Sequence, residues 1–529
     1  MSKSRIRVPA RTRVAASART SLPPRTSHAA ADLSSQALAG WMPALLSADA
    51  EWLLERDLSV ARIRDLTRND GWAQASIDRQ VDMAVGAALR LNAKPDARAL
   101  GITQDEADEF AAQIEAKWRA YALDPTFRCD AERMLPFPGL MGLIAREFVQ
   151  VGEALAVLRW IPRPGWPYRT AVQVVDPDRL GNPQGRPDDE RLRGGVELDA
   201  FGAPVAYHVR RGHQGDVGMF GQAWIWDRIP RFDVTGWERP KVLHVFERRR
   251  SGQHRGISRL VAALVQMRLL AKYSEAEVKA AAINGSIIGS IYTQLGAEFA
   301  AEALGNDTRT DWSVFNQQRA DFYGDRRVLD EARFITLFPS DRLDLNTTPR
   351  QTSGFPAFQT AFLQRFAASL GISYEQLSMD WSRTNYSSAR AALNEVWRSI
   401  QRLRAMIVWG AAQPIYAAWL EEAIDIGEVV PPPRAPDFYD APAAYVQAEW
   451  IGPGRGYVDP VKEAQAAALR IKARISTLER EVSDQGGDYQ MVLAQLRREA
   501  ALLAALGLSE PEPGVIVEAP EREERQVTN

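Results

Sequence analysis

Only a few residues of this 529-residue chain have the types and spacings that catalysis or metal binding requires. Asp176 and Asp178 flank Pro177 directly after an apolar run. They could hold a metal ion for nucleic-acid hydrolysis, although the proline favours an ordinary turn at a strand end. His208 and His213 lack an acid at metal-ligand spacing, and the chain contains neither a G-x-x-x-x-G-K-[ST] phosphate loop nor an H-E-x-x-H motif. The sequence therefore predicts no catalytic residues, no metal site and no cofactor.

A polar and aromatic segment offers a second kind of chemistry, which is contact with a polymer backbone. The segment consists of Asp380, Trp381, Ser382, Arg383, Thr384, Asn385, Tyr386 and Ser387. Its arginine can bind a phosphate, its hydroxyl and amide groups can form hydrogen bonds, and its aromatic rings can stack. None of these contacts reads a base sequence. A helix cap around Ser387 with Trp381 buried is a structural alternative that is compatible with such contacts.

Two long amphipathic helices are predicted to hold this segment between them. The helix before it, Phe355–Leu370, carries large apolar residues at four-residue steps: Phe358, Phe362, Phe366 and Leu370. The helix after it carries an apolar stripe at alternating steps of four and three: Ala389, Leu393, Val396, Ile400, Leu403 and Ile407. Further along the same helix, Gly410 and Pro414 predict a kink or a break.

The remaining chain alternates between helical and β-rich patterns. Helical spacing is predicted over Asp57–Leu91, over Ile102–Tyr121 with Thr103 as a cap, and at the start of 134–160, which ends as a strand at Ala154–Leu158. Short β-rich runs follow at Ala171–Val175, Val205–Val209, Trp224–Trp226 and Val242–Phe246. Residues 440–507 are predicted to be helical again, with a capping box at Ser476–Glu479 and an apolar stripe from Tyr489 to Leu503.

A long helix is also predicted from Gly256 to about Asn284, followed by a mixed segment. One face of this helix is charged, because Arg268, Lys272, Glu275 and Lys279 recur at steps of four, three and four. Such a face suits a water-filled bore, and it equally suits the solvated surface of a single molecule. In the mixed segment, a short helix is predicted at Glu298–Leu304 and a strand at Phe334–Phe338.

Composition and charge exclude several classes of protein. A formal net charge of −2 argues against a protein that grips nucleic acid over a broad basic surface. The single cysteine, Cys129, excludes an internal disulfide framework and is predicted to be a reduced, buried thiol. The absence of an apolar run of about 20 residues predicts no transmembrane helix. Residues 1–47 are predicted to be a disordered basic arm, and residues 509–529 a disordered charged tail.

Short strings along the chain occur in an order that resembles one protein family. They are Arg62–Asn69, Cys129–Arg133, Gly152–Leu155, Val175–Leu180, Arg193–Glu197, Val242–Phe246, Gln253–Gly256, Lys272–Glu277, Ser369–Arg398, Trp450–Pro453 and Asp459–Glu463. Together they cover most of residues 50–505, and the chain resembles the portal proteins of lambda-type tailed bacteriophages. Ser258 departs from the pattern, because that family often has proline after Arg-Gly-x.

The resemblance implies a mainly helical α+β portal fold that forms a ring, dodecameric in that family. The implied regions are a wing (48–255), a first stem helix (256–285), a clip (286–350), a second stem helix (351–373), a tunnel loop (374–387), a long kinked wing helix (388–430) and a helical crown (431–508). The tunnel loop, with Asp380–Ser387, would line the narrowest part of a DNA channel. The charged stem face would line the bore.

The implied function is that of a portal, or head–tail connector, at one capsid vertex, which passes double-stranded DNA without sequence preference during packaging and ejection. Implied partners are further copies of the chain, the terminase large subunit, the major capsid and scaffold proteins, and a head–tail connector protein, with no membrane. ATP hydrolysis would belong to terminase. The implied location is the virion, and the host bacterial cytoplasm during assembly.

Two further hypotheses stay open on the sequence. A metal-dependent nuclease would use Asp176 and Asp178, and a third carboxylate converging with them in a pocket would favour it. A non-portal helical scaffold or interaction protein would be favoured by an elongated molecule, or by a coiled-coil dimer without a closed ring.

Overall fold

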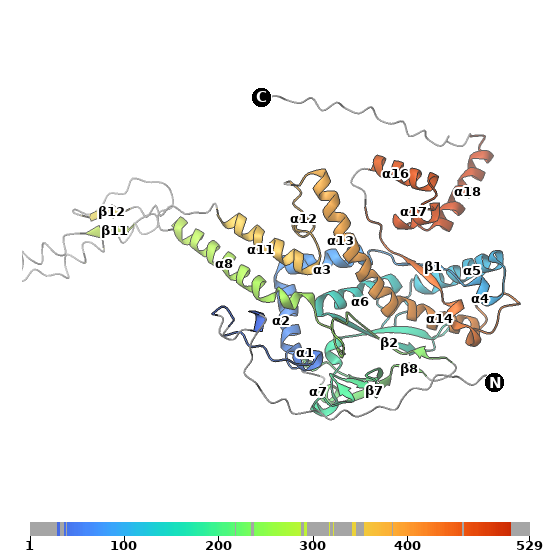
Figure 1. Ribbon diagram of the computed structural model, residues 1–529, viewed down its shortest axis with the longest axis horizontal. Coiled ribbons are helices and arrows are strands. Elements are labelled where there is room, and N and C mark those ends of the chain that lie inside the picture. The colour runs from blue at the N-terminus through green and yellow to red at the C-terminus, as the bar shows by residue number, and fades with distance from the viewer. Residues whose placement is uncertain are drawn as a thin grey trace, which may run out of the picture.

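The computed structural model describes residues 29–508 with several gaps. The gaps are 32–35, 39, 217, 219, 234–236, 287–289, 383 and 457–459, and between 294 and 353 only 317, 321 and 341–344 are described. Most of the predicted arm and the whole predicted tail, 509–529, therefore lie outside the described residues. Figure 1 shows a mixed body of helices and sheets, with α8 (Leu264–Ser286) and α11 (Phe355–Leu370) projecting to one side and α16, α17 and α18, within residues 460–505, above it. Helices predominate, which confirms the mainly helical α+β class.

Four long helices build the first half of the body: α2 Arg56–Asn69, α3 Gly71–Ala84, α5 Gln104–Ala122 and α6 Phe137–Val151. Asp70 separates α2 from α3, because its carboxylate accepts hydrogen bonds from the first backbone amides of α3. The predicted cap Thr103 is confirmed, since it forms a capping box with Glu106. The helical pattern predicted to Leu91 extends too far, because Leu91 lies in strand β1, Arg90–Ala93, where strand pairing outweighs the helical spacing.

Two antiparallel sheets complete the body. The first has the order β10–β2–β3 and consists of Val242–Phe246, Glu153–Trp160 and Thr170–Val175, where strands are predicted. The second has the order β4–β5–β6–β7 and consists of Leu192–Arg193, Val196–Leu198, Pro204–Arg210 and Trp226–Pro230. The predicted strand Trp224–Trp226 is wrong except for its last residue. Helix α7, Phe220–Ala223, comes just before, and the pairing of Arg210 with Trp226 fixes where β7 begins.

Several shorter elements connect these parts. They are helices α1 Ala48–Trp52, α4 Ala97–Leu100 and α15 Pro442–Tyr445, strands β8 Phe232–Asp233 and β9 Arg239–Pro240, and 3₁₀ turns at Ala29–Ala31, Pro177–Arg179, Pro183–Gly185 and Phe438–Asp440.

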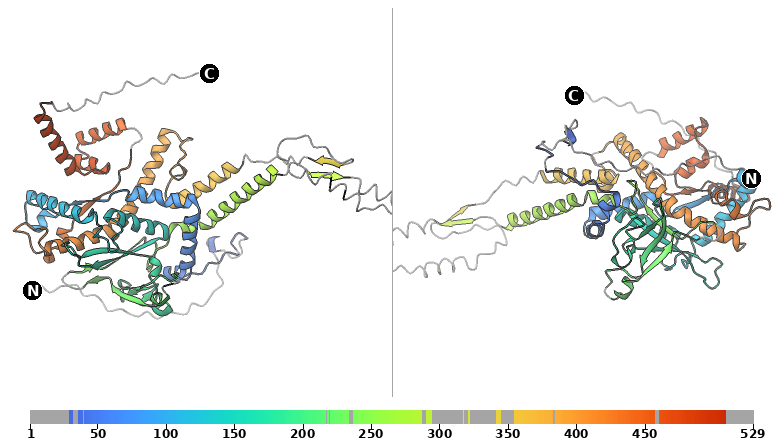
Figure 2. Two further views of the ribbon diagram at one scale, coloured as in Figure 1. Left: turned by 180° about the vertical axis from the view of Figure 1, so that it is seen from behind. Right: turned by 60° about the horizontal axis from the view of Figure 1, so that its bottom comes forward.

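The two-helix arm consists of α8, Leu264–Ser286, and α11, Phe355–Leu370, which lie side by side in Figure 1 and Figure 2. The predicted bounds of α11 are confirmed, but the helix predicted from Gly256 begins later. Ser258 first caps a 3₁₀ turn, Arg259–Ala262, and α8 follows that turn. Beyond α8, strand β11 (Ser290–Thr293) pairs with β12 (Asp341–Asp344). The helix predicted at 298–304 and the strand predicted at 334–338 lie outside the described residues.

A continuous helical path crosses the body from Tyr386 to Asp425. It consists of α13 Tyr386–Ile407, a π-helical turn Val408–Ala412 and α14 Gln413–Asp425. The distortion predicted around Gly410 and Pro414 takes the form of this π turn, without a break in the helix. Gly410 lies so close to strand β10 that a Cβ there would stand 2.8 Å from Val245 Cγ1. The predicted stripe on α13 is buried at five positions, and only Leu393 is half-buried.

The chain after α14 is less helical than predicted. Strand β13, Ala448–Ile451, pairs antiparallel with β1, so this part of 440–507 belongs to the body. The separate group of helices is α16 Pro460–Lys472, α17 Leu478–Asp484 and α18 Tyr489–Ala505. The capping box predicted at Ser476–Glu479 is wrong: Thr477 caps α17 by accepting from Arg480 N, and Glu479 pairs with Lys94. The predicted stripe on α18 contributes no buried residue.

Most of the buried side chains form one core that includes α3, α5, α6, α11, α13 and α14. Its centre is aromatic, with Trp118 of α5 packed edge-on against Trp419 of α14 at a centroid distance of 5.1 Å. Cys129 is buried in this core, as predicted, and burial raises the pKa of its thiol to about 12. A second, smaller core joins the two sheets through residues such as Leu155, Val157 and Tyr207.

One buried carboxylate joins the body to the base of the arm. Glu153, the first residue of β2, is 0% exposed. Its Oε1 accepts hydrogen bonds from Arg56 Nη2 at 2.9 Å and from Arg255 Nη2 at 2.6 Å. Its Oε2 lies 2.9 Å from His244 Nε2 and accepts from Gly256 N at 2.8 Å. Burial by itself raises the pKa of Glu153, but the guanidinium groups of Arg255 and Arg56 outweigh it and hold that pKa well below its usual range.

Two glycines allow this arrangement. A Cβ at Gly256 would stand 2.2 Å from Gly152 O, and a Cβ at Gly152 would stand 2.3 Å from the backbone of Ile257. Arg255 extends the network by donating from Nη1 to Leu180 O and from Nη2 to Pro177 O, both at 2.9 Å. The Gly152-Glu153 and Arg255-Gly256 pairs are thus the two sides of one contact.

We predict that Glu153→Gln lowers the free energy of unfolding by about 3–5 kcal/mol, because buried Arg255 loses its carboxylate partner and buried Arg56 keeps only Asp57 and Asp178. Urea denaturation measures this loss. Glu197→Gln is the matched control: Glu197 pairs with exposed Arg228 at 2.7 Å, so its loss should stay below about 1 kcal/mol. Because the pKa of Glu153 is lowered on folding, its contribution is complete above the ordinary carboxyl pKa of about 4.3 and disappears as the pH falls further. Equal losses in the two variants would contradict the role of Glu153.

Candidate functional site

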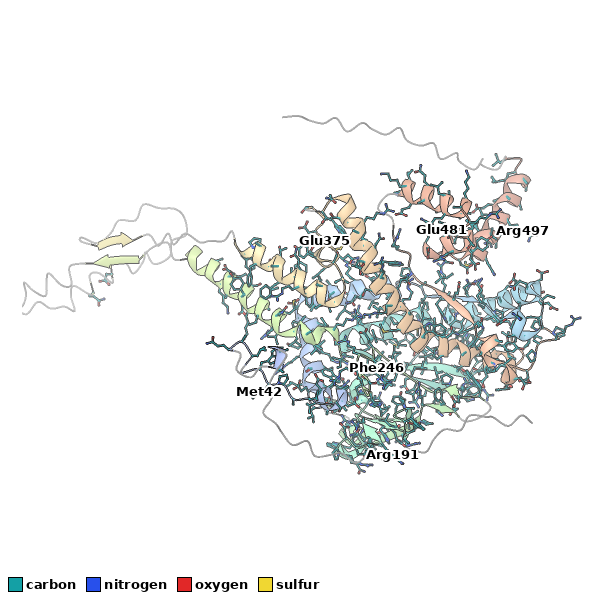
Figure 3. The ribbon with its side chains drawn as sticks, in the orientation of Figure 1. Met42, Arg191, Phe246, Glu375, Glu481 and Arg497 are labelled. Atoms are coloured by element: carbon teal, nitrogen blue, oxygen red, sulfur yellow. The ribbon has the colours of Figure 1, made fainter. Side chains whose placement is uncertain are left out.

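The predicted tunnel loop joins α12, Tyr374–Ser378, to α13 at a free end of the molecule, where Figure 3 labels Glu375. Ser373 and Gln376 form a capping box at the start of α12, and Met379 ends the helix with a positive φ of 57°. The loop is therefore shorter than the predicted 374–387. Helix α12 takes its first five residues, and Tyr386 already belongs to α13.

Local hydrogen bonds shape the short loop. Asp380 Oδ1 accepts from Ser382 N at 3.0 Å and from Ser382 Oγ at 2.6 Å. Asn385, and not Ser387, caps α13 by accepting from Ser388 N at 2.8 Å. The alternative with Trp381 buried is wrong, because that side chain is 37% exposed.

The structure describes the predicted loop residues unequally. The exposed ones are Asp380, Trp381, Ser382 and Asn385, and Thr384 is half-buried. Arg383 lies outside the described residues, as do the side chains of Tyr386 and Ser387. The described part of the loop thus presents one indole ring together with hydroxyl, amide and carboxylate groups.

A buried cation fixes the long helix behind the loop. Arg404 of α13 is 9% exposed and donates to Ala84 O at 2.8 Å, to Met83 O at 3.0 Å and to Pro453 O at 2.7 Å. Burial lowers its pKa to about 10. Ala84 is the last residue of α3, so the guanidinium group satisfies the free carbonyl end of that helix, where positive charge is favourable. Arg404 therefore ties α13 both to α3 and to the chain that leads to α16.

The predicted charged face of α8 is present in the structure. Arg268, Lys272, Glu275 and Lys279 are all exposed. Lys279 Nζ lies 2.5 Å from Glu275 Oε1, and this hydrogen bond lowers the pKa of Glu275. A different face of α8 packs on α11, with the Tyr273 and Phe358 ring centroids 4.7 Å apart.

The two aspartates considered for metal binding lie in an arginine network. Asp176 Oδ1 lies 2.9 Å from Arg64 Nη2, and Asp178 bonds both Arg64 and Arg56 at 3.1 Å. Asp176 also accepts from Asp178 N and so caps the turn that follows, as the proline favours. His213 lies close enough to complete a three-ligand group with them. A cation would have to displace two guanidinium groups there, so the geometry supports an ion-pair network.

Sequence reasoning did not identify Arg404 or the partners of Glu153. Arg404 could have been noticed in the sequence because it lies next to Leu403 and Ile407 of the apolar stripe, on the side of the helix that is predicted to be buried. For Glu153 the signal is a carboxylate at the head of an apolar strand, because such a group must find donors inside the protein.

Comparisons with known proteins agree on one family. The family model described as phage portal protein, lambda family, matches residues 34–404. The chain is 34% identical to the portal protein of Escherichia phage N15, and 33% identical to portal protein B of Escherichia phage lambda. Each alignment covers 90% of this chain and 89% of the relative. Among solved structures, the neck of an empty GTA particle is similar at 16% identity and a TM-score of 0.47, covering 86% of this chain and 94% of that one.

We predict that Arg404→Met lowers the free energy of unfolding by about 1–3 kcal/mol, because three carbonyl oxygens inside the protein lose their donor. Urea denaturation tests this against Arg398→Met on the same helix. The Arg398 side chain is 79% exposed and pairs with the equally exposed Glu395 on the same helix, so its loss should change stability by less than about 0.5 kcal/mol. A similar change in the two variants would show that Arg404 does not anchor α13.

Proposed function

The chain belongs to the lambda family of phage portal proteins, and from this premise we propose that its copies form a ring at one capsid vertex. Double-stranded DNA enters through the ring during packaging and leaves through it during ejection. The observation that carries the proposal is the alignment with two portal proteins over 90% of the chain. Portal proteins are structural, so the chain is not an enzyme. In the proposed assembly, ATP hydrolysis belongs to the terminase.

In this proposal the loop between α12 and α13 lines the narrowest part of the channel. Its exposed indole, hydroxyl and amide groups can touch DNA of any sequence, because they offer packing and backbone contacts only. Asp380 is the one charged side chain among the described residues 379–385, and it is turned onto Ser382. With Arg383 included, the loop carries one cation and one anion, and a loop without net charge holds phosphates weakly, which suits DNA that has to slide.

The two-helix arm serves as the stem of the proposed portal. The face with Arg268, Lys272, Glu275 and Lys279 turns toward the bore, where charged groups remain hydrated. The body is the wing, residues 286–350 form the clip that receives the terminase large subunit, and the helices after 460 form the crown. Three of the four charged groups on the stem face are cations and one is an anion, so the face carries a small net positive charge, and any contact it makes with phosphates is independent of sequence.

The proposed partners follow from this placement. They are further copies of the chain in a ring of about twelve, the major capsid and scaffold proteins, a head–tail connector protein, and double-stranded DNA without sequence preference. Among the helices that the structure describes, every one is too short or too polar to cross a membrane. The proposed location is the virion, after assembly in the host bacterial cytoplasm.

The test is a packaging reaction with proheads that carry variant portals. We expect Trp381→Ala to reduce the nuclease-protected DNA several-fold, because the loop loses its largest exposed contact surface, while the amount of portal in the prohead stays unchanged. Trp224→Ala is the matched control, since its side chain is 68% exposed just before strand β7 of the body. If Trp381→Ala packages like the wild type, the loop is not the constriction that DNA meets.

A further inference from the structure

The segment that precedes the first body helix exposes large apolar side chains. Trp41, Met42 and Leu45 are 72%, 73% and 101% exposed, and Leu46 is 46% exposed. Figure 3 labels Met42 at the edge of the body. Four such residues within six positions differ from the composition of a solvated tail, which is poor in large apolar residues. This short segment, Trp41–Leu46, is hereafter the apolar arm.

The base of the apolar arm is fixed to the body. Ser47 caps α1, and Asp49 of that helix is 2% exposed. Its carboxylate accepts from His254 N at 2.9 Å and lies 2.6 Å from His254 Nδ1. Arg250 also donates to Leu46 O at 3.0 Å. The arm therefore leaves the molecule at a defined point, and its six residues can reach about 20 Å from Ser47.

A groove between α2 and α8 offers a complementary surface. It has a volume of about 660 Å³ and is lined by apolar residues that include Ala61, Leu66, Leu264, Val265 and Leu269. Two of these, Val265 and Leu269, are 65% and 55% exposed. No residue of the apolar arm belongs to the lining. Within one chain, the apolar arm therefore lies outside the apolar groove.

Polar residues also line the groove: Arg62, Asp65, Asn69, Asp70 and Arg268. Asp65 accepts from Arg68 Nη2 at 3.0 Å and from Asn69 Nδ2 at 2.8 Å, both within its own helix, and Asp70 caps α3. The surface that an apolar occupant can bury in the groove is that of the apolar side chains of α2 and α8. Burying an exposed leucine or tryptophan there contributes about 25 cal/mol for each Å² removed from water.

We propose that the apolar arm of one copy docks in the α2–α8 groove of the neighbouring copy. A contact between two different surfaces of identical chains is heterologous, and repeated heterologous contacts close into a ring when the rotation between copies permits it. This inference rests on the proposed function, because it names the surfaces that join neighbouring subunits of the portal ring. The groove lies at the root of α8, so each docked arm also braces the stem of the next copy.

The test uses an engineered cysteine pair, Leu45→Cys with Val265→Cys, in the full chain. The background is clean, because Cys129 is the single cysteine, is buried and has a pKa raised to about 12. After oxidation, non-reducing electrophoresis is expected to show a ladder of covalent oligomers. Leu45→Cys with Val278→Cys is the matched control. Val278 is also exposed on α8 (69%) but lies 13 residues further out, about 20 Å along the helix, so that pair should stay uncrosslinked.

The mass of the unmodified chain is measured in parallel, so that a failure of arm docking can be distinguished from a failure to form the ring. Rings without a covalent ladder would overturn arm docking alone, and a bond formed within one chain would place the arm in its own groove. Neither ring nor ladder would overturn the proposed ring as well. Leu45→Arg gives an independent reading. It should reduce the ring fraction several-fold, whereas Leu54→Arg, at a position 90% exposed outside the apolar arm, should not.

Discussion

Glu153 imposes the constraint on which the rest of the structure depends, because a carboxylate with no exposed surface must be surrounded by donors. The donors come from three places: α2 through Arg56, β10 through His244, and the segment before α8 through Arg255 and Gly256. These bonds fix the point where α8 leaves the body. Every position further out on α8 follows from that geometry.

A second fixed point lies behind the loop that joins α12 to α13. Arg404 ties α13 to the end of α3 and to Pro453, and the π turn at Val408–Ala412 itself packs against β10 through Gly410. The loop before α13 thus stands at the end of a helix held along most of its length. If the loop lines the channel as we propose, such anchoring would hold it in place against moving DNA.

The sequence predicts those features of the fold that depend on local patterns. The spacing of apolar residues and the capping residues locate α5, α11, α13 and the strands β2, β3 and β10. Short strings of residues in the same order as in the family identify the family. Contacts between distant residues are not visible in local patterns. Leu91 and Trp450 lie in segments predicted to be helical, but they pair with each other in strands β1 and β13. Ser387 is the predicted cap of α13, whereas Asn385 caps that helix in the structure. The loop position was predictable, whereas Arg404 and the arginine partners of Glu153 required the folded structure.

Particle mass measured together with negative-stain electron microscopy of the purified chain tests the central claim, which is a closed ring, most directly. The account predicts particles with a central hole and a mass of about twelve chains of 58.9 kDa, with stems that project from one face. A discrete dimer of another shape, without a central hole, would contradict it.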